Sequence, residues 1–168
     1  FASEFKSSNP ELFQISLEKE NKEEIAFDAL HSTEIGKIAN MLNFGLMDTT
    51  TNVVKLIKFL FKAKNAYDLL EENYSTAQLH KRYKELNTFL NRQVEKAETE
   101  ANKESNLIFF TYSGNTSMSS IISNKLFFNN KNKLIVVAFI RPEKVNVSIR
   151  GENALEITKK AIEKIPRA

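Results

Sequence analysis

The residues with the clearest chemical potential lie in the last third of the chain. Asn106 to Tyr112 is a mostly apolar, aromatic-rich run, and the polar turn Ser113-Gly114-Asn115-Thr116-Ser117 and a helical pattern follow it. A buried strand that leads into a helix N-terminus presents free backbone N–H groups beside hydroxyl and amide side chains. Such a junction suits a phosphate or another anion, so we expect four candidate contacts here: Ser113, Asn115, Thr116 and Ser117.

The same turn also has a purely structural explanation. The first four N–H groups of a helix lack internal partners, so one of these side chains is expected to cap the helix that follows. Gly114 is expected to allow a turn with positive φ. The sequence leaves the cap and the anion contact open as alternatives.

A second candidate segment runs from Val145 to Gly151. Val145, Val147 and Ile149 alternate with Asn146, Ser148 and Arg150. This alternation predicts a half-buried strand whose apolar row faces the core and whose polar, basic row faces outward, where it could touch a ligand.

Arg150 is the leading candidate on that strand. A guanidinium at the end of a strand can hold a phosphate in a bidentate contact that a Lys cannot reproduce, and Ser148 would be a second backbone contact. The alternative is a surface Arg that pairs with Glu152 or Glu156, beside an exposed serine.

These segments need a small sheet to position them. The pattern predicts strands at 106–112, 133–140 and 144–150, and helices at 117–128 and 152–165. Arg141-Pro142-Glu143 is short enough for a hairpin, so the last two strands are expected to be antiparallel. The helix between the first two strands forms a crossover, which predicts a parallel pair and therefore a mixed sheet covered by helices.

Helices dominate the middle of the chain. We expect helices from Ser32, as N-cap, to Asn43, with an end near Gly45, and then at 50–64, 66–73 and 75–102. The long helix carries an apolar stripe: Leu79, Tyr83, Leu86, Leu90 and Val94. The stripe stops at Val94, which predicts a projecting spacer, and packing against neighbouring helices is preferred to a coiled coil.

Composition sets further limits. A chain of 168 residues with 42% hydrophobic content can bury one core and a smaller helical subdomain, and the 13 Phe with no Trp predict a Phe, Ile and Leu core. No cysteine means no disulfide and no thiolate metal site. No apolar stretch approaches about 20 residues and no signal peptide is visible, so we expect an intracellular protein, cytoplasmic or nucleoid-associated, with no membrane contact.

Charge is distributed unevenly along the chain. Phe1 to Glu34 holds three basic and eight acidic residues, a net charge of −5, whereas Lys103 to Ala168 has a net charge of +6. The basic part is the better candidate for a nucleic-acid contact, because Lys and Arg neutralise phosphates. The acidic part is expected to face a protein or solvent, and two ordinary solvated surfaces are the alternative.

Several of these segments together carry a family resemblance. The runs YSGNTSMSSIISNKL, KLIVVAFI and VNVSIRG, followed by NALEITKKAIEKI, resemble the DHH-associated domain of RecJ-like nucleases, which is the C-terminal substrate-binding half of the DHH phosphoesterase superfamily. Members show a hydroxyl-rich strand-to-helix turn, a V-x-x-S-x-R strand, and a helix that runs into a glycine-rich G-G-G-H loop. The resemblance covers roughly residues 106–168, and the helical region before it is similar to the family's interdomain connector.

The resemblance implies three regions and a fold class. Residues 1–31 would be the remnant of an upstream domain or an acidic partner-facing segment, 32–104 a helical connector, and 105–168 a nucleic-acid-binding domain truncated at its C-terminus. The fold class is α/β in the broad sense (α+β), with a helical region before a small mixed sheet. In the family, the Arg that matches Arg150 faces the cleft and helps to hold the nucleic-acid backbone.

Catalysis in this family requires Asp and His ligands around paired metal ions. The sequence has His31 and His80, neither in an Asp-His-His or D-x-D arrangement, so we assign no metal ligand and no catalytic residue. We expect no cofactor for this chain, and Mn²⁺ or Mg²⁺ if an upstream catalytic domain precedes Phe1.

Three functional hypotheses remain open. The first is a non-catalytic RecJ-like factor that binds single-stranded DNA or RNA and acts as a scaffold of the DNA replication machinery, since degenerate members in archaea and eukaryotes accompany the GINS complex and the MCM helicase. The second is the substrate-binding half of an active metal-dependent single-strand exonuclease or oligonucleotide phosphodiesterase. The third is a protein-interaction module without nucleic-acid binding, for which Val54, Ile57 and Phe61 are expected to form an exposed apolar face.

Overall fold

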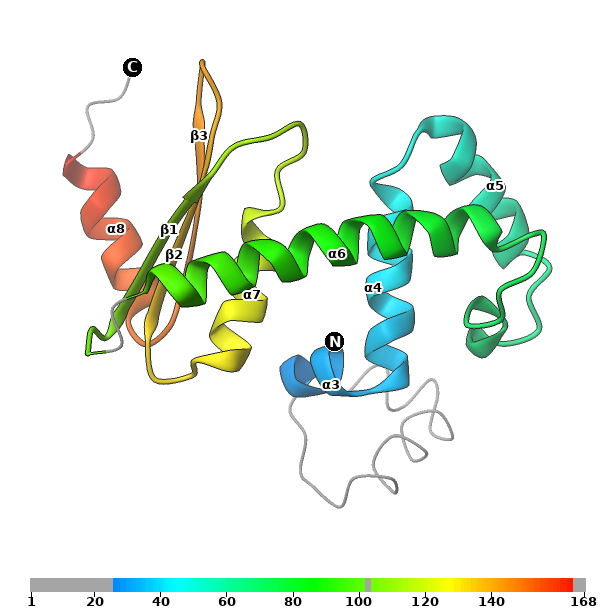
Figure 1. Cartoon of the computed structure of the whole chain (residues 1–168), viewed down its shortest axis with the longest axis horizontal. Helices are drawn as coiled ribbons and strands as arrows, with labels where there is room; N and C mark the ends of the chain where they lie inside the picture. The colour runs from blue at the N-terminus through cyan, green and yellow to red at the C-terminus, as the bar shows by residue number, and fades with distance from the viewer. Residues whose placement is uncertain (1–25, 102–103, 165–168) are drawn as a thin grey trace. The chain divides into compact units, whose positions relative to one another are not determined.

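A computed structural model describes residues 26–101 and 104–164 (Figure 1). Most of the segment 1–31 therefore lies outside the described residues. The chain divides into two compact units, which meet in the sequence between Asn87 and Thr88. The expected α+β fold with a small mixed sheet is confirmed.

The first unit is helical. Its elements are α3 (Ala26–Ser32), α4 (Glu34–Leu46), α5 (Thr50–Leu60), the 3₁₀ helix η1 (Ala66–Leu69) and the first part of α6 (Ala77–Glu100). A buried cluster joins α4, α5, η1 and α6: Ile38, Met41, Leu56, Leu69 and Leu79. The apolar positions of α4 and α6 therefore meet in one core, as their helical spacing predicted.

Thr33, and not Ser32, caps α4. Its hydroxyl oxygen accepts a hydrogen bond from the Gly36 amide at 3.0 Å, whereas Ser32 belongs to α3 and donates to the Asp28 carbonyl at 2.7 Å. The sequence prediction was wrong by one residue because α3 continues through Ser32 and the chain turns extended only at Thr33. A Cβ at Gly36 would clash with the backbone of α3, so this glycine lets the two helices approach closely.

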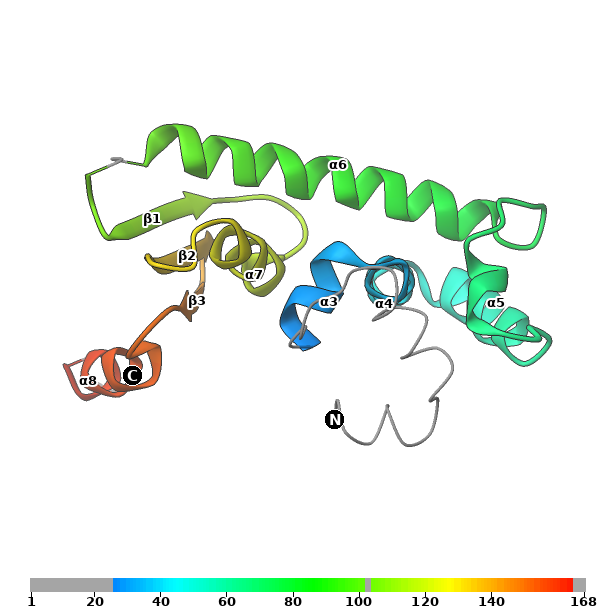
Figure 2. The same cartoon turned by 90° about the horizontal axis from the view of Figure 1, so that it is seen from below.

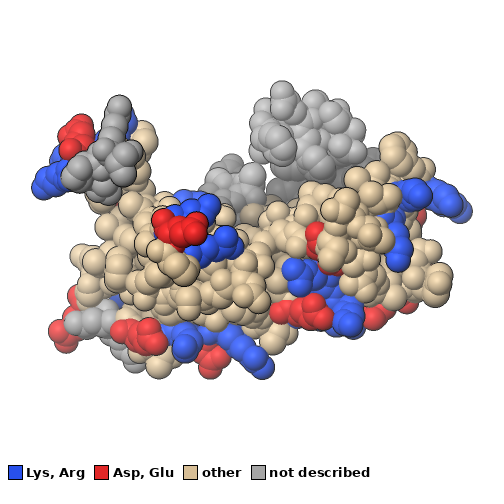
Figure 3. All heavy atoms as spheres, turned by 90° about the horizontal axis from the view of Figure 1, so that it is seen from above, with Lys and Arg blue, Asp and Glu red and all other residues tan. Residues whose placement is uncertain are grey.

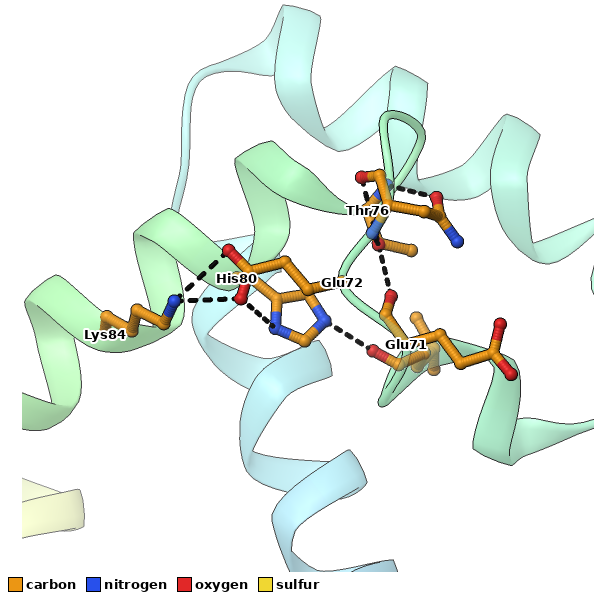
Figure 4. Close-up of polar contacts among 7 residues, drawn as sticks. Glu71, Glu72, Thr76, His80 and Lys84 are labelled. Atoms are coloured by element: carbon orange, nitrogen blue, oxygen red, sulfur yellow. Dashed lines mark hydrogen bonds and ion pairs between the residues drawn. The ribbon is translucent and has the colours of Figure 1, made fainter.

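A small polar cluster fixes the start of α6 (Figure 4). The ring of His80 is buried, and its Nε2 donates to the Leu69 carbonyl at 2.9 Å while Nδ1 lies 3.9 Å from Glu72. Lys84 donates to the same Glu72 carboxylate at 2.9 Å, and Thr76 donates to the Glu71 carbonyl at 2.5 Å. His80 therefore has a structural role, joining α6 to η1.

The second unit is a three-stranded sheet with helices. It contains β1 (Leu107–Tyr112), α7 (Ser119–Asn129), β2 (Leu134–Ile140), β3 (Val145–Arg150) and α8 (Ala154–Lys164). The strand order is β1-β2-β3, with β1 parallel to β2 and β2 antiparallel to β3. The predicted crossover and the predicted hairpin are therefore both confirmed.

One face of the sheet forms the core of this unit. Ile108, Phe110 and Tyr112 of β1 are buried, as are Ile122 and Leu126 of α7. The second half of α6 packs on the same core: its Phe89 ring lies 6.3 Å from the Tyr112 ring, and Ala97 is 2% exposed. The predicted projecting spacer is therefore wrong, because the small Ala97 extends the apolar stripe by another turn beyond Val94.

The side chains of β3 face the opposite way from the prediction. Asn146, Ser148 and Arg150 lie toward α7 and are half-buried, whereas Val145 and Val147 are 54% and 53% exposed. The polar row faces inward because α7 supplies polar partners for it, and the apolar row lies on the sheet face that α7 does not cover.

That open face continues across the other strands. Leu107 and Phe109 of β1 are 41% and 64% exposed, and Ile140 of β2 is 46% exposed. Helix α8 lies on the side of β3 opposite α7 (Figures 1 and 2), yet none of its residues is buried. The second unit therefore presents an apolar sheet face, which we call the open sheet face: the exposed Leu107, Phe109, Ile140, Val145 and Val147, with the half-buried Ile149.

Candidate nucleic-acid interface

Three side-chain hydrogen bonds join β3 to the start and middle of α7. Asn146 donates to the Ser117 hydroxyl at 3.4 Å, the Ser148 hydroxyl donates to Ser119 at 3.0 Å, and the Arg150 Nε donates to the Asn124 side-chain oxygen at 2.6 Å. We call this row of six side chains the polar strip. It contains three of the six residues that the sequence singled out: Ser117, Ser148 and Arg150.

The strip follows from local geometry. Residues 146, 148 and 150 point to the same side of β3 because the side-chain period of a strand is two. On α7, Ser119 and Ser123 are buried at 6% and 0% exposure, and their small side chains let the helix come close to the sheet. Because polar side chains buried in such a contact need partners, each residue of the β3 row is paired with a hydroxyl or amide of α7 or of the turn just before it.

Arg150 is half-buried and partly engaged. Besides the bond to Asn124, its Nη1 donates to the Ile149 carbonyl at 2.8 Å. Within the described part of the chain Nη2 has no partner, so it can donate to an outside acceptor. The expected alternative, a pair with Glu152 or Glu156, is not formed among the described residues, and Glu156 accepts from Lys160 at 2.7 Å.

The Ser113–Ser117 turn does not cap the helix as predicted. Helix α7 starts at Ser119, its N-cap residue is Met118, and no side chain caps it. Instead the Met118 amide donates to the Tyr112 hydroxyl at 2.6 Å. The prediction was wrong because Tyr112, at the end of β1, reaches across the turn and its hydroxyl accepts this hydrogen bond.

The individual turn residues are placed differently from one another. Ser113 and Asn115 are exposed, whereas Thr116 and Ser117 are half-buried. Gly114 has a φ of 157°, so the expected positive φ is confirmed. The exposed members of the turn are open to solvent beside an uncapped helix N-terminus, and the N–H groups of such a terminus favour an anion.

Arg141 is a candidate that sequence reasoning missed. Its Nη2 donates to the Asn115 carbonyl at 3.0 Å, and its guanidinium lies 5.0 Å from the centre of the Phe139 ring. The residue was treated as part of a turn. The signal that could have found it is the parallel pairing of β1 and β2, because the carboxyl ends of parallel strands meet at one edge of the sheet.

The two arginines lie at opposite ends of the strip. Asn146 pairs with Phe139 across the hairpin, close to Arg141, whereas Arg150 pairs with Ile135 at the far end. A rise of about 3.3 Å per residue puts the ends of this strand segment roughly 13 Å apart. Arg150 and the Arg141 end of the strip, where the Asn115 carbonyl lies, are therefore separate, and the candidate contacts form a linear arrangement.

A further basic group lies near the Arg150 end. Lys125 of α7 lies 5.1 Å from the centre of the Phe128 ring, and Lys131 lies 5.7 Å from it. These lysines belong to the basic stretch of residues 125–133. They add positive charge beside Asn124, the partner of Arg150.

Charge on this molecule is interspersed. Figure 3 shows Lys and Arg beside Asp and Glu on the face drawn, without a large surface of one sign.

Burial raises the pKa of the Tyr112 phenol above its ordinary value of 10.0, although the bonds to Met118 and Ser117 work in the other direction. Tyr112 is therefore a neutral phenol near pH 7, and the positive charges near the strip come from Arg and Lys.

Metal and membrane sites are not seen in the described residues. Within 26–101 and 104–164, no group of three or more His, Cys, Asp or Glu side chains is arranged to hold a metal ion. In the same ranges no helix is both long enough and apolar enough to cross a membrane.

No protein-family model, curated protein or solved structure matches this chain. The resemblance to the DHH-associated domain therefore stays a prediction that depends on the quoted sequence runs.

Proposed function

We propose that this chain is a non-catalytic factor that binds single-stranded nucleic acid along the polar strip and serves as a scaffold for protein partners. The observation that supports the proposal is the placement of two arginines: Arg141 lies beyond the Asn146 end of the strip, and Arg150 lies at the other end. Guanidinium groups at a fixed separation suit a chain of phosphates.

Arg141 is the best placed of these groups for a phosphate. It is exposed, and the Asn115 carbonyl and the Phe139 ring hold its guanidinium in position. A cation that is already held loses less conformational entropy when it binds than a free side chain does. The turn residues Ser113 and Asn115 lie beside it and can contribute further donors.

A protein-interaction module is the second candidate function. The open sheet face supports it, because Phe109 at 64% exposure and Val147 at 53% exposure present apolar surface on strands that are otherwise well packed. Exposed contiguous apolar surface is typical of a protein contact. The replication-fork partners that the resemblance implies, of the GINS or MCM type, belong instead to the first proposal, in which the chain also serves as a scaffold.

Fluorescence anisotropy with a labelled oligo-dT strand at several salt concentrations tests the nucleic-acid proposal. The Arg141→Ala variant is expected to bind more weakly for all sequences, and the logarithmic salt slope should become shallower by about 0.7 for each lost phosphate contact. Lys159→Ala, on exposed α8, is the matched control and should bind like the unmodified chain.

Two results would count against the proposal. If the unmodified chain shows no salt-dependent binding to oligo-dT or oligo-U, the nucleic-acid function is wrong and the interaction module is favoured. If binding occurs but Arg141→Ala and Lys159→Ala have equal affinities and equal salt slopes, the strip is not the binding site.

A further inference from the structure

Helix α5 in the first unit carries two exposed rows of opposite character. Val54, Ile57 and Phe61 form an apolar row that is 43%, 42% and 87% exposed, and we call it the α5 stripe. Lys55, Lys58 and Lys62 form a basic row at helical spacing on the next face. The sequence Thr50–Leu60 contains no Asp or Glu, so the helix itself offers these lysines no acidic partner.

A cavity lies beside the basic row. It has a volume of about 510 Å³, and its lining includes all three lysines, with Leu56 and Phe59 as apolar members. The first turn of α6, residues 77–79, lines it from the other side. The Ala77 amide at the start of α6 already donates to the Asn73 carbonyl at 2.8 Å, so the attraction for an anionic group comes from the lysine row.

Among the described residues that line the cavity, the acidic one is Asp48, and its carboxylate already accepts hydrogen bonds. The carboxylate of Asp48 accepts hydrogen bonds from the Thr49 amide at 2.7 Å, from Asn52 at 3.1 Å and from Gln78 at 3.3 Å. Burial alone would raise the pKa of Asp48, but these bonds together hold it below its ordinary value. Asp48 therefore organises the cavity wall, and the three lysines leave the lining with a net positive charge.

We propose that this surface of the first unit binds an acidic amphipathic helix of a partner protein. The apolar side chains of that helix would pack on the α5 stripe, and its Asp or Glu side chains would lie along the lysine row. Lys55 and Lys62 are seven residues apart, which is about 10 Å or two helical turns, so acidic residues at the same spacing on a partner helix match them. Binding of an amphipathic helix in this way is the helix-in-groove mode of peptide recognition.

Two features favour a helix over other anionic partners. A nucleic-acid backbone would use the lysines but has no need of the apolar row formed by Val54, Ile57 and Phe61. An anionic lipid surface would use both rows but, being flat, would leave the cavity unfilled, whereas a side chain from a partner helix can enter it. The surface lies in the first unit, so this proposal is independent of the polar strip.

The test uses the full chain and designed peptides. The probe is a fluorescein-labelled helical peptide of about five turns with leucines along one face and glutamates beside them. A second peptide carries glutamine in place of every glutamate. We expect the glutamate peptide to bind at least about tenfold more tightly than the glutamine peptide, since three charge pairs are gained.

Three variants locate the site. The triple change Lys55→Glu, Lys58→Glu and Lys62→Glu is expected to weaken binding of the glutamate peptide by roughly 10- to 100-fold. The matched control reverses three exposed lysines elsewhere: Lys81→Glu, Lys96→Glu and Lys159→Glu. The third variant, Phe61→Ser, should weaken both peptides, and circular dichroism should show that all three variants keep their helix content.

Several outcomes would overturn the proposal. The first is no binding of the glutamate peptide, and the second is equal affinity for the two peptides. The third is an equal loss of affinity in the triple α5 lysine variant and in the triple control variant. Competition by oligo-dT or by anionic vesicles that depends on the α5 lysines would assign the surface to nucleic acid or membrane instead. Oligo-dT affinity of the α5 variant, measured alongside, should be unchanged, so failure here is distinct from failure of the polar strip.

Discussion

The hydroxyl of Tyr112 accepts a hydrogen bond from the amide of Met118 at 2.6 Å, and both residues are buried. This bond spans the turn between β1 and α7. It satisfies a buried N–H that no capping side chain satisfies. The end of the strand and the beginning of the helix are thus held together by one phenol.

Replacing Tyr112 with Phe should therefore destabilise the protein although the ring is kept. The Met118 amide would lose its acceptor in a buried position, which costs about 1–3 kcal/mol of unfolding free energy. Urea denaturation followed by circular dichroism measures the change. Tyr74→Phe is the control, since Tyr74 is fully exposed and its loss should have no measurable effect. Equal free energies of unfolding for the two variants would show that the hydrogen bond does not contribute to stability.

Alkaline pH should weaken the fold through two tyrosines. Burial raises the pKa of Tyr83 and of Tyr112 above the ordinary value of 10.0. A raised pKa in the folded state means that folding favours the neutral phenol. The contribution of the two neutral tyrosines to the free energy of unfolding is therefore complete below about pH 10, and it is lost as the pH rises through the folded pKa. Unfolding free energies measured between about pH 9 and pH 11 should fall more steeply for the unmodified chain than for Tyr83→Phe/Tyr112→Phe. Parallel curves would contradict the assignment.

Arg150 and Asn124 should act as one unit. Arg150→Ala and Asn124→Ala each break the 2.6 Å bond, and each is expected to lower the unfolding free energy by about 1–2 kcal/mol, a value reduced for the partial exposure of Arg150. The double variant should be less destabilised than the sum of the two, because the second change removes a group that has already lost its partner. Additive effects would mean that the contact contributes nothing.

The two faces of the sheet should respond oppositely to a polar substitution. Phe110 is 3% exposed and Phe109 is 64% exposed, although they are neighbours on β1. Phe110→Ser should cost about 3 kcal/mol or more, whereas Phe109→Ser should change stability by about 0.5 kcal/mol or less. Thermal unfolding of both variants checks this. A large loss in Phe109→Ser would mean that the open sheet face is covered in the isolated chain.

The sequence predicted the elements of the second unit well, because strand and helix periods are local properties. The hairpin and the crossover followed from the length of the connections alone, as the short Arg141-Pro142-Glu143 link illustrates. The facing of β3 could not be predicted in this way. The alternation of apolar and polar residues along β3 predicts that Val147 and Ser148 lie on different faces of the sheet, but the position of α7 decides which of these faces is buried.

The candidate site was predicted in part for the same reason. Ser148, Ser117 and Arg150 were recognised from their types, and they lie on one line because α7 provides Ser119 and Asn124 opposite β3. Arg141 was missed because its role depends on the Asn115 carbonyl, which belongs to a different segment. The spacing of residues along the sequence does not predict contacts between segments that are far apart in the chain. The exposure of Val54, Ile57 and Phe61, in contrast, was predicted correctly.

The strand connections of the second unit set an order in which its parts can assemble. The β2–β3 hairpin joins residues that are close in sequence, such as Ile140 and Val145, so it can form within microseconds. Pairing of β1 with β2 brings Leu107 to Leu134 and must wait until the chain through α7 has closed a longer loop. We therefore expect substitutions in β1 to accelerate unfolding more than they slow refolding, whereas substitutions in the hairpin slow refolding.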